Sequence, residues 1–255
     1  MQLVGTTIKA NERLIIIDDL LVADRFIANI DEAKNHYEVR SIYSHDIGDA
    51  LAQAFDKNSL QVMALAARAA ATVDGGNGGT VVAGVPAAAT ISAADFEEAT
   101  FDAVQALDEK DVPEEDRYTF VDPRIYWALV GGSTSLLNRD FNPNPNGSYS
   151  RGLVSQIAGT ELVKTNNLPR TNVTTGPTAY RGDFRQTVAL VCHRSAMGTV
   201  KLIDLAVEKD YLIEYQGTLM VGKYAVGHGI LRPESAVELS SWTVSTSGVS
   251  GDVTS

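Results

Sequence analysis

The sequence has one cysteine, no long apolar run and no recognisable secretion pattern, and each shortage excludes a class of protein. Because a disulfide within the chain needs two thiols, Cys192 in TVALVC is expected to be a small buried hydrophobic residue, which fits folding in a reducing cytoplasm. No stretch approaches the roughly 18 apolar residues of a membrane-spanning helix, so we expect no membrane partner. The start, MQLVGTTIKANER, lacks the basic and then apolar pattern of a secretory signal.

Clustered positive charge is also missing. The formal charge is −11, and the 21 lysines and arginines are scattered along the chain. Strong binding to nucleic acid regardless of its sequence needs grouped basic residues that neutralise phosphates. We therefore expect no direct, strong binding to DNA or RNA.

Catalytic and metal-binding patterns are absent from the sequence. The four histidines are not spaced as metal ligands: His36, His45, His193 and His228. GxSxG, a Walker lysine loop and GxGxxG after a strand are also missing. His193, Ser195 and Asp204 carry the groups of a catalytic triad, but nothing supplies an oxyanion hole. We expect no enzyme activity, no cofactor and no metal, with His193 and His228 in structural roles.

A long helix is the clearest element in the sequence. From Glu32 to about Ala71 there is no proline, and apolar residues recur at the helical period. Asp31 is a plausible cap, and Gly48 or the stretch 56–59 could bend the helix. Two consecutive helices or a helical hairpin is the alternative. DGGNGG, residues 74–79, then predicts a flexible loop, since a phosphate cradle would follow a strand and precede a helix.

Shorter elements follow. Ser92 and Asp95 form a capping box for a helix that runs to about Lys110. Residues 118–121 predict a strand, and Asp122 with Pro123 a helix start that Gly131 ends. GLVSQIAGTELVK predicts two strands around Gly159. Residues 170–187 predict an exposed loop, residues 187–233 several strands, and the Ser/Thr/Gly-rich end no core element.

Three segments carry a resemblance to a known family. They read NHYEVRS (35–41), HRSAMGTVKLIDLAVEK (193–209) and KYAVGHGILRPESA (223–236). In this order they resemble the major capsid proteins of T-seven-like short-tailed bacteriophages, which have the Hong Kong 97-type capsid fold. The resemblance implies an α+β chain with a long spine helix, a peripheral domain and an axial domain.

The resemblance also implies a division of the chain. The expected segments are 1–30, the returning strand of the extended loop; 31–130, the peripheral spine helix leading into the axial domain; 131–190, the axial domain with a capsomer-facing loop; 191–240, the peripheral strands; and 241–255, the tail. The family's N-terminal arm and outgoing loop strand are expected to be missing. The returning strand would then lack its hairpin partner, and such an edge invites pairing with other chains.

The implied function is that of a structural subunit, a major capsid protein that self-assembles into hexamers and pentamers of an icosahedral phage shell around viral DNA. Implied partners are copies of itself, a scaffolding protein, a portal and packaged DNA without sequence-specific binding, with assembly in the host cytoplasm. The candidate interface residues are Arg181, Asp183, Arg185, Asn167, Glu161 and Arg40. An encapsulin-like cellular shell protein and a soluble α+β enzyme are the alternatives.

Overall fold

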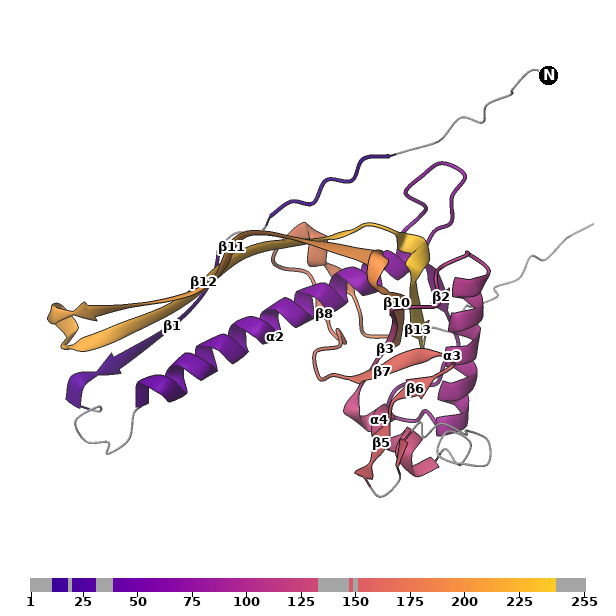
Figure 1. Cartoon of the computed structure of the whole chain (residues 1–255), viewed down its shortest axis with the longest axis horizontal. Helices are drawn as coiled ribbons and strands as arrows, with labels where there is room; N and C mark the ends of the chain where they lie inside the picture. Colours follow the sequence, from indigo (N-terminus) through magenta and orange to yellow (C-terminus); the bar gives the residue numbers. More distant parts are fainter. Residues whose placement is uncertain (1–10, 18–19, 31–38, 133–146, 149–150, 242–255) are drawn as a thin grey trace, which may run out of the picture.

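The structure, a computed structural model, describes residues 11–17, 20–30, 39–132, 147–148 and 151–241. A long helix and a three-stranded sheet form an extended arm, and a six-stranded sheet with two helices forms a thicker body at one end of it (Figure 1). The helices are α2 (Val39–Arg68), α3 (Ala93–Asp108) and α4 (Pro123–Gly132). The short 3₁₀ helices are η2 (Thr178–Tyr180), η3 (Arg194–Ala196), η4 (Ile213–Tyr215) and η5 (Pro233–Ser235).

Within the described ranges, thirteen strands form two larger sheets and two short pairs. The strands are β1 (Leu21–Ala28), β2 (Thr80–Val82), β3 (Arg117–Val121), β4 (Gly147–Ser148), β5 (Leu153–Val154), β6 (Gln156–Ile157), β7 (Thr160–Lys164), β8 (Asn172–Val173), β9 (Gly182–Asp183), β10 (Thr187–His193), β11 (Met197–Leu212), β12 (Gly217–Ile230) and β13 (Ala236–Ser240). The arm sheet has the order β1-β12-β11, and the body sheet has the order β2-β13-β10-β3-β7-β6.

Helix α2 is one continuous helix of 30 residues, about 45 Å long at 1.5 Å per residue. The long-helix prediction is confirmed over Val39–Arg68, and the alternative of two helices is wrong. Asp31 and residues 32–38 lie outside the described residues. The buried face changes partner along the helix. Ile47 and Leu51 pack on the arm sheet, whereas Leu60 and Ala64 pack on the body. The helix therefore joins the two parts.

Strand β1 has a long-range partner in the arm sheet, and this partner is not the hairpin strand of the extended loop. It pairs antiparallel with β12 along its whole length, from Leu21 opposite Tyr224 to Ala28 opposite Gly217. This partner lies about two hundred residues further along the chain, where no local pattern marks it. The expectation that the returning strand lacks its hairpin partner stays a prediction. The other edge of β1 remains a sheet edge, as does the outer edge of β11.

The body is built around its central strands. All seven residues of β10 are buried, as expected for an apolar run in the middle of a sheet. Helices α3 and α4 contribute Phe96, Leu107 and Ile125 to the same core as β13 and β3. Cys192 is buried in β10, as predicted, and burial raises the pKa of its thiol to about 12.

Local signals in the sequence are mostly confirmed. The backbone N–H of Asp95 donates to Ser92 Oγ at 3.2 Å, and the Ser92 N–H donates back to the Asp95 carboxylate at 3.3 Å. The Asp122 carboxylate accepts from the N–H of Arg124 at 2.9 Å, at the start of α4. That helix ends at Gly132 rather than Gly131.

The predicted turn between β6 and β7 places Gly159 at φ 78°. The predicted glycine loop is not loose: a Cβ on Gly79 would overlap the carbonyl oxygens of Ala66 and Ala67, and Lys110 donates to the Gly78 carbonyl at 2.7 Å. Most of the predicted loop before Gly152 and the predicted tail lie outside the described residues.

Candidate assembly surfaces

The arm exposes apolar side chains on β11 and on the turn that follows it. Four side chains there are more than half exposed: Leu202 (69%), Leu205 (53%), Ile213 (72%) and Tyr215 (69%). Large apolar side chains exposed in groups mark interaction surfaces, so the arm has the character of an interaction surface. None of the described helices is long and apolar enough to cross a membrane.

The turn between β11 and β12 is held in a fixed shape. Gln216 adopts a left-handed conformation with φ 49°, and its side-chain amide donates to the Ile213 carbonyl at 2.8 Å. The Asn29 N–H donates to the Gln216 carbonyl at 3.0 Å, and the Asn29 amide donates to the Tyr211 hydroxyl at 2.9 Å. The ring of Tyr215 meets that of Phe26 edge to face. These contacts tie the turn to the end of β1.

An apolar groove of about 200 Å³ lies between α2 and the arm sheet. Leu51, Phe55 and Gly48 line it from the helix. Ile203 and Leu205 line it from β11, at a place where β11 carries two irregularities in its register against β12. Such bulges twist a strand and redirect its side chains.

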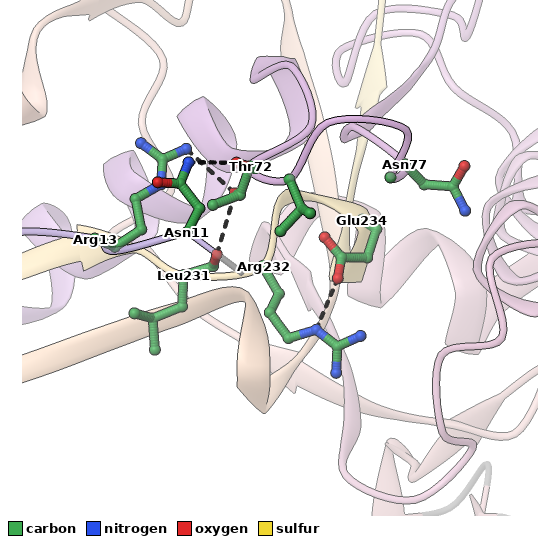
Figure 2. Close-up of a pocket in the computed structure, with 9 residues that line it drawn as sticks. Asn11, Arg13, Thr72, Asn77, Leu231, Arg232 and Glu234 are labelled. Carbon is green, nitrogen blue, oxygen red and sulfur yellow. Dashed lines mark hydrogen bonds and ion pairs between the residues drawn. The ribbon is translucent and has the colours of Figure 1, made fainter. Parts of the chain in front are cut away.

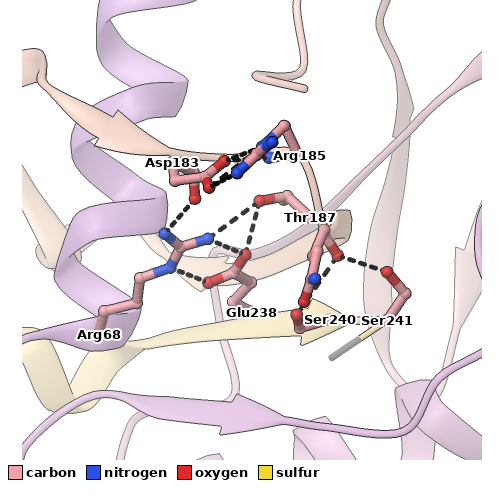
Figure 3. Close-up of polar contacts among 8 residues, drawn as sticks. Arg68, Asp183, Arg185, Thr187, Glu238, Ser240 and Ser241 are labelled. Carbon is pink, nitrogen blue, oxygen red and sulfur yellow. Dashed lines mark hydrogen bonds and ion pairs between the residues drawn. The ribbon is translucent and has the colours of Figure 1, made fainter. Parts of the chain in front are cut away.

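A polar cluster fastens the end of α2 to the body (Figure 3). Arg68 donates two hydrogen bonds of 2.6 Å to the carboxylate of Glu238, which is fully buried in β13. Thr187 donates to the same carboxylate at 2.6 Å, and Arg68 also donates to the Asp183 carbonyl at 2.6 Å. The hydrogen bond to Glu238 raises the pKa of Arg68. The only hint in the sequence is a carboxylate in the middle of the apolar strand AVELS.

Three predicted interface residues lie together on the segment 170–187. Asp183 and Arg185 form an exposed ion pair with contacts of 2.6 and 2.9 Å. These hydrogen bonds lower the pKa of the Asp183 carboxyl to about 2. Arg181 donates to the Gly176 carbonyl at 2.8 Å. The segment is exposed, as predicted, but buried Tyr180 and Phe184 anchor it, and Phe184 belongs to the core cluster that α2 forms with the body.

The other three predicted residues lie elsewhere. Asn167 donates to the Asp56 carboxylate on α2 at 3.2 Å. Glu161 is exposed on β7, opposite Tyr118 of β3. Arg40 is half-buried in the first turn of α2, about 42 Å along the helix from Arg68 at 1.5 Å per residue. The structure therefore does not bring Arg40 to the group around Asp183.

The residues considered for catalysis do not form a triad. The His193 Nδ1 and the Ser195 hydroxyl lie 2.7 Å apart, and Ser195 donates onward to the Ser235 hydroxyl at 3.0 Å. Asp204 pairs with Lys201 on the exposed face of β11 instead. Burial lowers the pKa of His193. Within the described ranges no three His, Cys, Asp or Glu side chains are grouped as metal ligands.

A polar cleft of about 520 Å³ lies where residues 11–13 pass the end of α2 (Figure 2). The Asn11 amide donates to the Thr72 carbonyl at 2.6 Å, and Arg13 donates to the Thr72 hydroxyl at 3.2 Å. Arg232 and Glu234, which also line the cleft, form an ion pair of 2.7 Å. The two hydrogen bonds to Thr72 hold residues 11–13 against the segment that follows α2.

Solved structures with this architecture include phage capsids. The capsid of cyanophage P-SCSP1u superimposes with a TM-score of 0.83 at 41% identity, over 94% of this chain and 77% of that one. The mature capsid of bacteriophage PhiM1 gives a TM-score of 0.72 at 18% identity, over 94% and 78%, which shows the fold alone. The chain thus has the Hong Kong 97-type α+β fold, and its class is that of subunits that self-assemble into a multimeric shell.

Sequence comparison narrows the class to a family. A family model described as "Gp10A-like: Major capsid protein" matches residues 2–240. The major capsid protein of Escherichia phage T7 is 34% identical, over 90% of this chain and 73% of its own length, and that of Enterobacteria phage T3 is 32% identical over the same shares. The chain belongs to this major capsid protein family. It is a structural protein of the phage head and not an enzyme, and the cellular-shell alternative is not favoured.

Proposed function

We propose that this capsid protein forms the hexamers and pentamers of an icosahedral shell, assembles in the host cytoplasm with a scaffolding protein and a portal, and encloses packaged DNA. The observation that supports it most is the arm, which exposes apolar side chains on a fixed backbone. The net charge of −11 supports a wall that surrounds DNA without binding it tightly.

The proposed peripheral domain consists of α2 and the strands of 191–240, and the proposed axial domain of 131–190, with 1–30 leading into the helix and 241–255 as a tail. The arm formed by α2, β1, β11 and β12 supports the peripheral part. Strands β10 and β13 lie in one sheet with β3 and β7, so the two proposed domains share the body sheet.

We also propose that the exposed residues of the segment 170–187, with Arg181, Asp183 and Arg185, meet a neighbouring subunit at the capsomer axis, and that Asn167, Glu161 and Arg40 belong to further contacts. Exposure of Asp183 and Arg185 supports this, because a neighbour can reach both. Their existing pair means that a neighbour would share or exchange partners. A charge reversal, Asp183→Lys, should impair capsomer formation more than folding of the subunit.

Electron microscopy of the purified chain, with and without a co-expressed scaffolding protein, tests the proposal. Closed particles or rings of five and six copies are the expected result. Nuclease treatment of particles formed during infection then tests DNA enclosure, since enclosed DNA survives digestion. Monomers alone under all conditions, including co-expression with the scaffold, would contradict the proposal.

A further inference from the structure

We propose that the turn Ile213–Tyr215 at the tip of the β11–β12 hairpin inserts into the apolar groove between α2 and the arm sheet of a second copy of this chain. The inference rests on the self-assembly of the subunit and adds to it a particular contact. It follows from two features of the arm, an exposed apolar turn and an apolar groove, which cannot contact each other within one subunit.

The turn Ile213–Tyr215 already has a fixed conformation in the single subunit. Side chains on a loose turn would lose conformational entropy on docking, whereas this turn is already held by Asn29, Tyr211 and Gln216. Ile213 and Tyr215 nevertheless remain 72 and 69% exposed. A rigid turn that presents an aliphatic and an aromatic side chain to water has the composition of an interface anchor.

The groove offers the matching surface. Its volume of about 200 Å³ suits one large side chain, and its lining is mainly apolar, with Leu51 and Phe55 on one side and Ile203 and Leu205 on the other. Its rim carries Asp56, which accepts from Asn167, and Asp204, which pairs with Lys201. Glu214 at the tip is therefore expected to stay on the solvent side while one of its two apolar neighbours enters and the other covers the rim.

The tip cannot reach the groove of its own subunit. Ile213 lies eight positions after Leu205 of β11, which is roughly 26 Å at 3.3 Å per residue. The intervening strand pairs with β12 and the arm is three strands wide, so it does not fold back on itself. Figure 1 shows the tip at the far end of the arm from the body.

A second copy is the occupant that the function supplies, because a shell subunit is surrounded by identical neighbours. Docking of the tip of one copy into the groove of another uses two different surfaces. Each subunit can therefore form one contact through its tip and a second through its groove. Contacts of this head-to-tail kind close into rings when the rotation between copies allows it. The same pairing, repeated over a shell, would cover apolar surface on every subunit.

Cysteine cross-linking tests the contact, and the chain is well suited to it because its one native thiol, Cys192, is buried. Gly48→Cys places a thiol in the groove, where a Cβ has no atom within 4 Å. Tyr215→Cys places one on the tip. The two single variants are mixed, assembled and oxidised, and non-reducing electrophoresis should show cross-linked dimers. Each variant alone should show none, and the double variant should give a ladder of longer products.

The control replaces the tip variant with Asp102→Cys, on the exposed face of α3. Normal particles in which the Gly48–Tyr215 mixture cross-links no more than this control would overturn the docking but leave the shell function intact. Absence of particles from the unmodified chain would contradict the shell function instead. If Tyr215→Cys prevents assembly, the pair Ala52→Cys and Ile213→Cys replaces it, with the same expected and opposing outcomes.

Discussion

Glu238 binds Arg68 at the end of α2, and its replacement tests how much this contact stabilises the fold. Glu238→Leu removes two hydrogen bonds from Arg68 and one from Thr187, each 2.6 Å long. It also leaves the Arg68 cation, whose side chain is only 30% exposed, without its carboxylate. Breaking a buried ion pair from one side costs about 3–5 kcal/mol. We expect about 3 kcal/mol here, because water reaches part of Arg68.

Urea denaturation of unassembled subunits measures this cost. With a slope of about 2 kcal/mol per molar urea, the midpoint should fall by roughly 1.5 M. The double variant Arg68→Met with Glu238→Leu should recover part of the loss, since no charge is then left buried. Arg185→Leu, at the exposed pair nearby, is the control and should lower the midpoint much less, because exposed ion pairs contribute only about 0–1 kcal/mol. A midpoint unaffected by Glu238→Leu, or a double variant no better than the single one, would refute the reasoning.

Four further outcomes are expected. Leu51→Pro, in the buried face of α2, should cost about 3 kcal/mol or more and abolish assembly, as judged by thermal melting and electron microscopy. The Cys192 thiol should resist a thiol reagent at pH 8 until the chain is unfolded, because a pKa of about 12 leaves almost no thiolate. NMR titration should place the Asp183 pKa near 2 and, in Arg185→Ala, return it towards 3.8; the pair's contribution is present above pH 3.8 and is lost as the pH falls through 2. Gly79→Ala should lower the melting temperature more than Gly48→Ala, since only the first Cβ would overlap the backbone of α2.

Local chemistry made much of the fold predictable. The capping pair Ser92 and Asp95 and the start of α4 at Pro123 act within a few residues, so the sequence around them carries the whole signal. The long helix was predictable because a proline-free run with apolar residues at the helical period admits few other structures. The family resemblance added the architecture, which periodicity alone does not supply.

Long-range pairing set the limit of prediction. Nothing near β1 indicates that Leu21 will lie opposite Tyr224, or that Glu238 will receive Arg68 from 170 positions away. The candidate interface residues were likewise only partly predictable. The charges at Asp183 and Arg185 were correctly placed on an exposed segment, but their pairing with each other depends on a local backbone shape that composition does not reveal.

Strand β12 also has a consequence for the order in which the chain folds during synthesis. It carries four glycines, at 217, 222, 227 and 229, and glycine weakens an isolated strand. It also lies between β1 and β11, so it depends on partners from both ends of the sequence. The ribosome makes β1 and α2 first, and the apolar face of the helix around Leu51 then lacks its cover until residues near 226 emerge. At a synthesis rate of about 5–20 residues per second, that interval lasts on the order of ten seconds or more, and it is the period when the nascent chain is most exposed to aggregation and most in need of a chaperone.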